Sequence, residues 1–582
     1  WDQFSEWLHC VCVVTFDLEL GQAMEFLYPN HIELSDVERT NICYLAFPDS
    51  NSGCMGDTQY WFRIRRSALY KTTDTDVDYQ CSKDCPVTLL KDKTHFYGYV
   101  YFRQVRDKTL KRGYFQKSVV LLSSLPYFNF FKDIVDIIAP EYFDNGEPCL
   151  EAACHDIDQW PSPIPGQILN LPLMGLLLHV RIPTKQDKPG TNVLEITDKN
   201  SDPGAFSLSS IHEVNLYESL CDVLPHIHLL WELVLIGAPI VVMAPSPTVC
   251  SSTVLALVSS ISPLRYCSDY RPYFTIHDSE FKEYTTKTQA PFFITYFTLS
   301  TFLFFIKMPL IHKHWLDPLL KHTDVCSKIR YLCFIPVDVK TWRVRGAGEF
   351  PWTHLNIAPP STKLKMASKI KTFDPKSGIY SKYKQFLKKD KNFIKGLTKD
   401  FSGKCQFQAQ SALLRRHFLE LTQSFIIPLE RYLASLMPLQ KCISPLKAPP
   451  TLKPFRPNDF IQTLDSNGPQ LTSGTKGDWI GLYRRFMQSA NFEHWLCRRK
   501  LEMEKKLVSL HMAALSETDL MSWCQQKSEV EIVDMVLRIR EKINLVRSHK
   551  LDVSTETVEL LADKLTGITN TLPADLQGIL SK

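Results

Sequence analysis

Two pairs of strand-like segments near the start of the chain set the strongest limit on its fold. Residues 8–16 and 23–28 are short apolar runs on either side of a turn that contains Gly21. Residues 97–105 and 114–122 form a second such pair, joined by a polar turn. Apolar runs of this length, rich in Val, Tyr and Phe and separated by turn residues, predict β-hairpins.

A helix is expected directly after the second hairpin. Its apolar residues recur every three or four positions, at Tyr127, Phe130, Phe131, Ile134, Ile137 and Ile138. Two hairpins followed by a packed helix predict a small sheet covered by helices on one or both faces.

A second α/β block begins near Ile211, after a connector rich in Pro, Gly, Asp and Ser. Residues 229–236 predict a helix that ends at Gly237, and residues 240–244 predict a short strand. Ser246-Pro247 then begins another helix. A helix, a strand and a helix in so short a span indicate a parallel or mixed sheet.

The stretch at residues 292–310 is long and apolar enough to suggest a helix that crosses a membrane, which needs about 20 mostly apolar residues. Several Thr and Ser residues, Lys307 and Pro309 interrupt it, and its Phe and Thr favour a buried strand. We expect the strand and keep the membrane helix as the alternative.

From about Gln408 onward the pattern is helical. We expect Pro428 to break or kink the first of these helices, because proline lacks the N–H of the helical hydrogen bond. Ser516 with Asp519, and Ser528 with Glu531, have capping-box spacing and predict two further helix starts. The fold class is therefore α/β plus α.

Composition narrows the class of protein. The 582 residues carry a net charge of only +5, which does not indicate a nucleic-acid partner. The 17 cysteines are scattered without paired metal-ligand spacing, so we expect buried, reduced thiols in a cytoplasmic protein. The chain opens at Trp1 with no signal peptide and no Met, and we expect an N-terminal tail before it.

Searches for catalytic and cofactor motifs mostly return nothing. The sequence contains no phosphate-binding loop of the G-x-x-x-x-G-K-[ST] type and no G-x-S-x-G elbow. His212-Glu213 begins like a zinc-protease motif, but Leu216 occupies the position of the second histidine. We therefore expect no cofactor, no metal site and no hydrolytic active site.

Several long blocks resemble the DENN family. Residues 10–30, 42–53 and 98–118 resemble the upstream part of a DENN module, residues 230–247 and 270–286 its core part, and residues 415–441 and 477–486 its downstream part. The resemblance is to the sixth group of DENN domain-containing proteins, its B type more than its A type. It implies a tripartite fold with a longin-like α/β lobe, a central α/β core and a helical downstream region.

The resemblance also divides the chain. It implies an upstream lobe at residues 1–182, a connector at 183–210, a core lobe at 211–345, a lysine-rich linker at 346–407 and a downstream helical region at 408–582. Residues 292–362 depart from the family pattern. Mis-spliced or intron-derived sequence is one explanation, and a genuine insertion is the other.

The implied function is guanine-nucleotide exchange on a Rab GTPase. Such a factor binds GDP-loaded or nucleotide-free Rab and speeds GDP release, in this group at recycling endosomes, where it would be cytoplasmic and peripheral to the membrane. A GTPase-activating protein of the longin–DENN type and a non-catalytic Rab-binding adaptor remain alternatives. No catalytic residue carries over. The candidates for Rab contact come from the matched blocks of the two lobes, and they are Arg103, Arg106, Lys108, Arg112, Arg271, His277, Asp278 and Glu280.

The lysine-rich linker is where the positive charge gathers. Residues 363–400 contain twelve lysines and three aspartates, so the rest of the chain is mildly acidic. A solvated linker is one interpretation. Peripheral docking on anionic membrane through Lys388, Lys389 and Lys391 is the other, because basic residues near such a surface are attracted to it.

Overall fold

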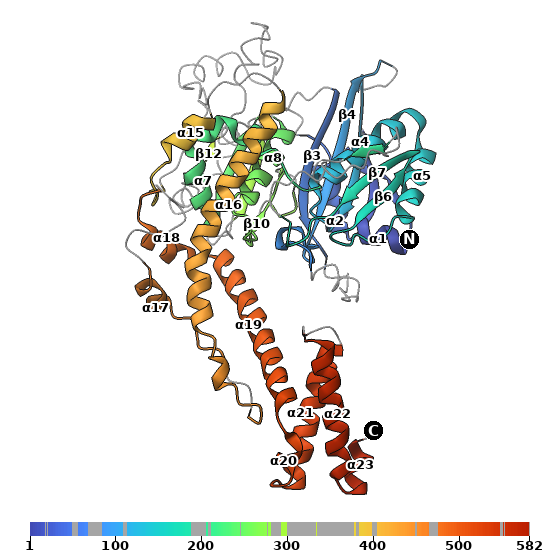
Figure 1. The fold of residues 1–582 in the computed structure, drawn as a ribbon. Helices are drawn as coiled ribbons and strands as arrows, with labels where there is room; N and C mark the ends of the chain where they lie inside the picture. Colours follow the sequence, from blue (N-terminus) through green and yellow to red (C-terminus); the bar gives the residue numbers. More distant parts are fainter. Residues whose placement is uncertain are drawn as a thin grey trace, which may run out of the picture. The chain divides into compact units, whose positions relative to one another are not determined.

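The computed structural model shows two compact units (Figure 1). The first comprises residues Trp1–Thr422 and Leu471–Leu482, and the second comprises Gln423–Gln470 and Tyr483–Lys582. The structure describes residues 1–17, 19, 21–48, 56–67, 84–108, 113–187, 205–207, 211–244, 246–275, 278–280, 293–298, 333–334, 378–379, 383–397, 404–447, 451–464, 475–547, 551 and 553–580.

A five-stranded antiparallel sheet is the framework of the N-terminal lobe, residues 1–182. Its order is β2-β1-β5-β4-β3. The strands are β1 (Cys10–Asp17), β2 (Gly21–Tyr28), β3 (Gly56–Arg65), β4 (His95–Arg106) and β5 (Tyr114–Ser123). Both predicted hairpins are confirmed, since β1 pairs with β2 and β4 pairs with β5. Gly21 and Gly113 at the two turns have positive φ angles of 79° and 74°, which favour glycine.

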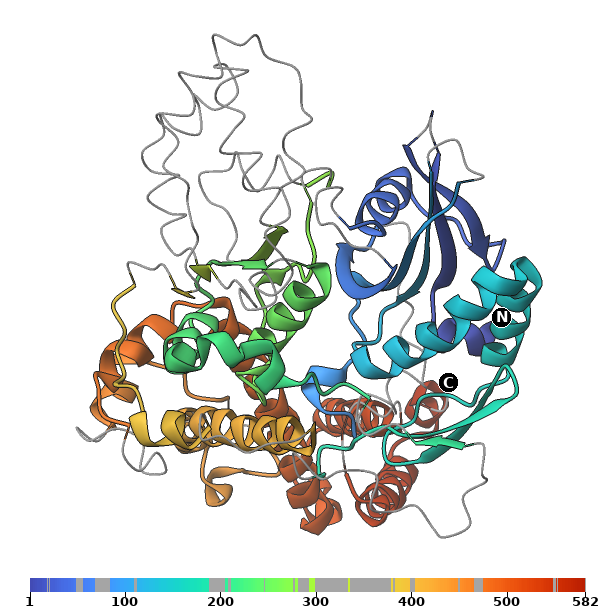
Figure 2. The same cartoon turned by 90° about the horizontal axis from the view of Figure 1, so that it is seen from above.

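Helices cover both faces of this sheet (Figure 2). The predicted helix is α4 (Phe128–Asn145), and it is followed by α5 (Glu147–Asp158). Side chains alternate along β4, so Tyr99 packs on Phe131 of α4, whereas Phe102 faces the other way and packs on Phe47. Phe47 follows α2 (Asp36–Leu45), whose C-terminal end lies on that second face, and α1 (Asp2–Trp7) precedes β1.

A smaller sheet begins at the end of the N-terminal lobe. It contains β6 (Ile168–Leu173), β7 (Leu176–Arg181) and β8 (Ala205–Ser207), in that order. β8 pairs in parallel with β7, so the predicted connector at 183–210 contributes a strand rather than only a link. The 3₁₀ turn η1 (Val87–Leu89) lies between β3 and β4.

The central lobe is built on a three-stranded parallel sheet of order β10-β11-β9. Its elements are α6 (Leu216–Leu220), η3 (Cys221–His226), α7 (Ile227–Leu235), β9 (Ile240–Ala244), α8 (Pro247–Ser259), β10 (Asp269–Tyr270) and β11 (Phe293–Thr298). The predicted helix–strand–helix order is confirmed. Gly237 has a φ of 64° directly after α7, and the Ser246 side chain accepts the first hydrogen bond of α8 from the Val249 N–H.

The apolar stretch at 292–310 begins as strand β11, as expected, and its remainder lies outside the described residues. No helix in the described part of the chain has the length and apolar character needed to span a membrane. Of the departing region 292–362, only β11 and β12 (Cys333–Phe334) are described, and β12 pairs with β13 (Gly378–Ile379).

The rest of the described chain is helical, as predicted. It contains α15 (Lys391–Leu397), α16 (Lys404–Ser435), η6 (Gln440–Cys442), α17 (Pro457–Gln462), α18 (Trp479–Phe486), α19 (Ala490–Glu517), α20 (Leu520–Cys524), α21 (Glu529–Arg547), α22 (Thr555–Thr571) and α23 (Ala574–Leu580). Apolar residues of α19 to α23 form the core of the C-terminal end of the second unit.

The helical predictions fared differently in detail. Pro428 lies inside α16 and does not break it, because buried Phe425 and Leu429 on either side hold the helix by packing, and a kink at Pro428 stays a prediction. Ser516 lies inside α19, and Asp519 alone caps α20, accepting from two backbone N–H groups. Ser528 does precede α21, and its N–H donates to the Glu531 carboxylate as a capping box requires.

The pairing of β4 with the edge strand β3 depends on a glycine. A Cβ atom at Gly98 would lie 2.1 Å from Cζ of Phe62, a fully buried ring that cannot move into solvent. We predict that Gly98→Ala destabilises the N-terminal lobe by about 1–3 kcal/mol through overpacking. Gly396→Ala is the matched control, because no atom lies within 4 Å of its added Cβ. Thermal unfolding should separate the two variants, and equal melting temperatures would contradict this packing.

Candidate functional site

The two lobes of the first unit contact each other along β3. Helix α8 of the central lobe packs on this strand, and the Thr248 hydroxyl donates to the Gln59 carbonyl at 2.6 Å. The Tyr273 hydroxyl donates to the Phe47 carbonyl at 3.1 Å, and its ring packs edge-on against Tyr60 at 4.9 Å. Directional polar contacts and ring packing therefore fix one lobe against the other.

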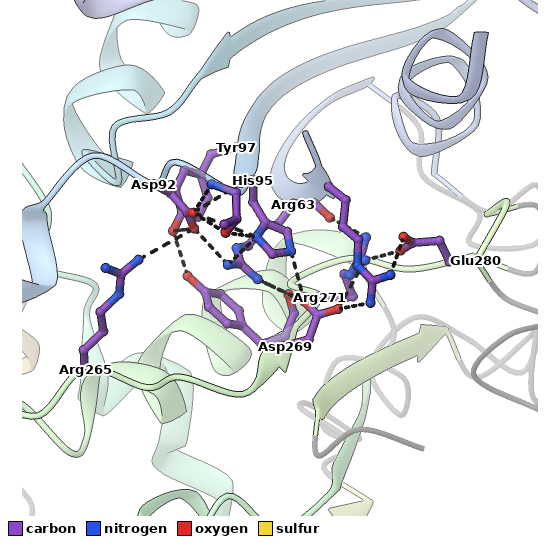
Figure 3. Close-up of polar contacts among 11 residues, drawn as sticks. Arg63, Asp92, His95, Tyr97, Arg265, Asp269, Arg271 and Glu280 are labelled. Carbon is purple, nitrogen blue, oxygen red and sulfur yellow. Dashed lines mark hydrogen bonds and ion pairs between the residues drawn. The ribbon is translucent and has the colours of Figure 1, made fainter. Parts of the chain in front are cut away.

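A network of charged residues, the inter-lobe network, lies at the end of this contact (Figure 3). It consists of Arg63, Arg65, Asp92, His95, Tyr97, Arg265, Asp269, Tyr270, Arg271 and Glu280. β3 and β4, with the loop between them, supply members from the N-terminal lobe, and β10 with its flanking residues supplies those from the central lobe.

Arg63 is the N-terminal lobe's main contribution. It projects from β3, and its side chain is only 7% exposed. Its Nη2 atom lies 2.8 Å from Asp92 Oδ2 and its Nη1 atom 3.0 Å from Asp269 Oδ1. The guanidinium also lies over the Tyr270 ring, 4.3 Å from its centroid. One buried cation thus joins a carboxylate of each lobe.

Arg271 completes the network from the other side. It is 1% exposed and donates to the backbone carbonyl of Arg63 at 3.0 Å. It also pairs with Asp269, at 3.3 Å, and with Glu280. Arg65 lies 3.4 Å from Asp269 and 3.3 Å from Glu280, so both carboxylates are shared between arginines.

The side chains of His95, Tyr97 and Tyr270 lie beside these ion pairs. His95 Nε2 lies 3.4 Å from Asp269 Oδ1, and His95 Nδ1 lies 2.9 Å from Arg63 Nη2. The hydroxyls of Tyr97 and Tyr270 lie 3.1 Å apart, one from each lobe. The Tyr97–Tyr270 hydrogen bond thus joins the two lobes directly.

The electrostatic balance of the network favours the charged carboxylates. Burial by itself would raise the pKa of Asp269, but the hydrogen bond from His95 and the charges of Arg271 and Arg63 outweigh it and lower the pKa well below its ordinary value. Burial opposes charge on Asp92 in the same way, and His95 and Arg63 likewise hold its pKa low. These lowered pKa values indicate that the network stabilises the joined lobes when its carboxylates are ionised.

Three of the four candidates at or after the end of β10, namely Arg271, Asp278 and Glu280, belong to this junction or lie beside it. Arg271 pairs inside the network, and Glu280 is half-buried in it. Asp278 is 4% exposed, and burial raises its pKa to about 6 against the opposing charge of Arg271. Arg271 and Asp278 are therefore buried in the absence of a partner, and their direct contact with a Rab stays a prediction. His277 lies outside the described residues.

The candidates at the second hairpin differ among themselves. Arg103 donates from Nε and Nη2 to the Asp57 carboxylate at 2.7 and 2.9 Å, and its guanidinium lies over the Phe143 ring. Arg106 and Lys108 are exposed near the turn, whereas Arg112 lies outside the described residues.

The three membrane-docking candidates lie together. Lys388, Lys389 and Lys391 are all exposed, directly before or at the start of α15. Lys389 Nζ lies 3.2 Å from Nδ1 of His226.

Sequence reasoning missed the central members of the network. Arg63, Asp92, His95 and Asp269 were not among the candidates. Arg63 and Arg65 do carry a signal, since charged residues interrupt the apolar strand YWFRIR. A charge inside a buried strand needs a partner.

The arrangement joins the two lobes, because its arginines pair with carboxylates of both lobes, which is the chemistry of a clamp. The described residues contain no group of three or more His, Cys, Asp or Glu that could hold a metal ion.

We predict that Arg63→Ala opens the junction. Removing one partner of a buried ion pair leaves Asp92 and Asp269 uncompensated, which costs about 3–5 kcal/mol. Amide hydrogen exchange in β3 and β10 should report this loss. Arg416→Ala, which removes an exposed pair with Glu420 in the same unit, is the control and should change little. Equal protection in both variants would refute the clamp.

Another buried carboxylate, that of Glu232 in α7, predicts that the stability of the fold depends on pH. Burial raises its pKa to about 7, although backbone N–H groups of Phe386 and Leu387 donate to it. Because the folded state binds the proton more tightly, the free energy of unfolding should fall as pH rises from about 4.5 to about 7. Asp278 acts in the same direction.

Urea unfolding at several pH values across this window checks the prediction. Glu232→Gln should reduce the slope, whereas Glu420→Gln, an exposed carboxyl in the same unit, should not. A slope unchanged by Glu232→Gln would show that another group dominates.

Comparison with known proteins identifies the family. The family models "Transport protein Avl9" and "DENND6 C-terminal domain" match residues 8–148 and 520–582. Mouse Protein DENND6A is 53% identical over 586 residues, covering 100% of this chain and 91% of the relative. Human Protein DENND6B is 48% identical over 581 residues, covering 100% and 94%. A DENND6 homolog from Dictyostelium discoideum is 30% identical over 599 residues, covering 93% and 77%.

The identities do not favour the B type over the A type. The fold agrees with the expected longin-like lobe, α/β core and helical downstream region. On the strength of relatives aligned over its whole length, the chain belongs to the DENND6 family of DENN-domain proteins.

Proposed function

We propose that this protein is a guanine-nucleotide exchange factor that promotes GDP release from a Rab GTPase. Its membership of the DENND6 family carries the proposal, because DENN-domain proteins are in general Rab exchange factors. An exchange factor acts by binding nucleotide-free Rab more tightly than nucleotide-bound Rab. It therefore needs a fixed surface of the right shape, which two clamped lobes supply.

The tip of the second hairpin has the side chains best suited to contact a Rab. We define the hairpin tip as Val105, Arg106, Lys108 and Tyr114. Val105 is 47% and Tyr114 36% exposed, which is unusual for large apolar side chains in a strand pair. Apolar and aromatic anchors beside a few charges are the composition of binding hot spots.

In this proposal the inter-lobe network holds the two lobes in place. Arg271, Asp278 and Glu280 lie where the central lobe meets β3 and α2, since the Ser279 N–H donates to Asn41 of α2 at 3.1 Å. Their proposed role is to fix the angle between the lobes, which sets the distance between surfaces that a Rab would contact.

Cellular location is part of the proposal. By resemblance to its family, the protein would act in the cytoplasm at recycling endosomes, on the GDP-bound or nucleotide-free form of its Rab.

Two other functions are distinguishable. A GTPase-activating role would need an arginine presented to the nucleotide, and Arg103 is already held by Asp57. A Rab-binding adaptor would bind without changing either reaction. Arg106, the other candidate arginine, is exposed, so an assay of both reactions separates exchange from hydrolysis.

The test is GDP release from purified Rab GTPases with wild-type protein and with Arg106→Glu/Lys108→Glu. We predict about tenfold lower kcat/KM for the variant, since charge reversal in an interface slows association. Lys505→Glu/Lys506→Glu, two exposed lysines of α19, is the matched control and should leave exchange unchanged.

Parallel measurement of GTP hydrolysis separates the alternatives. Faster hydrolysis without faster GDP release would replace the proposal with a GTPase-activating role, and binding without either effect would indicate an adaptor. Exchange that survives the hairpin reversal would move the contact away from the hairpin tip.

A further inference from the structure

The described part of the lysine-rich linker is bound to the central lobe. Residues 383–397 return to the central lobe, where Glu232 holds them. Glu232 is 0% exposed and accepts from the Tyr383 hydroxyl at 3.2 Å and from the backbone N–H groups of Phe386 and Leu387 at 3.0 and 2.8 Å. Three hydrogen bonds to one buried carboxylate fix the backbone just before the exposed lysines.

A second segment, around Gly477, pairs with the segment around Leu387. Leu387 and Gly477 form an antiparallel bridge. The Lys388 N–H donates to the Lys476 carbonyl at 2.7 Å, and the Asp478 N–H donates to the Phe386 carbonyl at 2.9 Å. Glycine is required at 477, because a Cβ atom there would lie 2.4 Å from the Phe386 carbonyl oxygen.

This pairing directs lysines of both segments to the same side. Leu387 is buried, so alternation along the strand turns the next residue, Lys388, outward. Lys476 lies opposite Lys388 in the bridge and therefore shares its face, and both are exposed. Lys391 and Lys395, one turn apart on α15, share the exposed face of that helix.

Two acids beside these lysines in the chain are engaged by backbone N–H groups. Asp390 Oδ1 accepts from the N–H groups of Asn392 and Phe393 at 3.1 and 3.0 Å. Asp478 Oδ1 accepts from the Gly481 N–H at 2.8 Å. Each of these two carboxylates is used in a helix start, and the two joined segments carry exposed lysines. We call five of these lysines the lysine platform, and its members are Lys384, Lys388, Lys389, Lys391 and Lys476.

We propose that the lysine platform docks on the anionic face of a lipid bilayer, and that it is assembled from both segments. Its charge comes from lysine alone, a hydrated point charge on a flexible stem, whereas recognition of one fixed phosphate or carboxylate favours the rigid fork of arginine. A fluid array of lipid headgroups matches such adaptable charges. The proposal rests on charge and backbone geometry, so it stands or falls independently of exchange activity.

Co-sedimentation of the full chain with vesicles tests the docking. The vesicles contain phosphatidylcholine alone or phosphatidylcholine with phosphatidylserine. We expect binding only to the anionic vesicles, weakening as salt is added. Lys388→Gln/Lys391→Gln/Lys476→Gln should lower partitioning by about fivefold for each charge removed. The control Lys505→Gln/Lys506→Gln should bind as wild type does.

Two single variants test the assembly. Lys476→Gln should weaken binding as much as Lys388→Gln, although the two lie in different segments. Gly477→Val changes no charge but separates the segments, and it should also weaken binding, with circular dichroism and the thermal unfolding transition confirming that the chain stays folded.

Three results would overturn the proposal. Equal binding to neutral vesicles, or unchanged binding by the triple variant, would refute docking on anionic lipid. A Lys476→Gln variant that binds as wild type, beside a weakened Lys388→Gln, would refute assembly from two segments.

Discussion

One carboxylate, that of Asp269, carries the joint between the two lobes. Asp269 lies on the short strand β10. Its carboxylate pairs with Arg63 and Arg65 of β3 and with His95 of β4, and also with Arg271 of its own segment. Burying it would be costly if any of these partners were absent, because an unpaired charge in a low-dielectric interior is strongly unfavourable. The network is therefore stable only when both lobes are in place.

For the proposed exchange function, this constraint explains how a chain without a recognisable nucleotide-binding motif would act on a nucleotide-binding partner. Exchange requires complementary shape and charge toward a Rab, which rigid lobes and an exposed hairpin provide. The buried network provides rigidity, and the hairpin tip provides groups that remain available for contact. The lysine platform adds a third role, since a catalyst held at a membrane meets a membrane-bound partner more often.

The fold was predictable where the pattern is local. Short apolar runs separated by turn residues, Gly21 among them, indicated both hairpins, and Ser246 marked the start of α8. The end of α16 was not predictable in the same way, because packing around Pro428 overrides the local preference of proline. Local rules describe one segment at a time, and tertiary contacts decide such cases.

The site was predictable only in part. Arg271 and Glu280 were named from matched blocks, but their burial and their partners were not visible. Arg63 and Asp269 lie 206 residues apart in the chain, and a single sequence does not indicate that two such distant residues are in contact. A buried strand interrupted by arginine indicates that a partner exists without indicating which residue it is.

The most direct test of the account is the rate of GDP release from a panel of purified Rab GTPases at increasing concentrations of the wild-type chain. The account predicts that release from at least one Rab accelerates in proportion to the concentration of the chain, and that a stable complex with nucleotide-free Rab forms when no nucleotide is added. Unchanged GDP release from every Rab in the panel, with a folded chain, would contradict it.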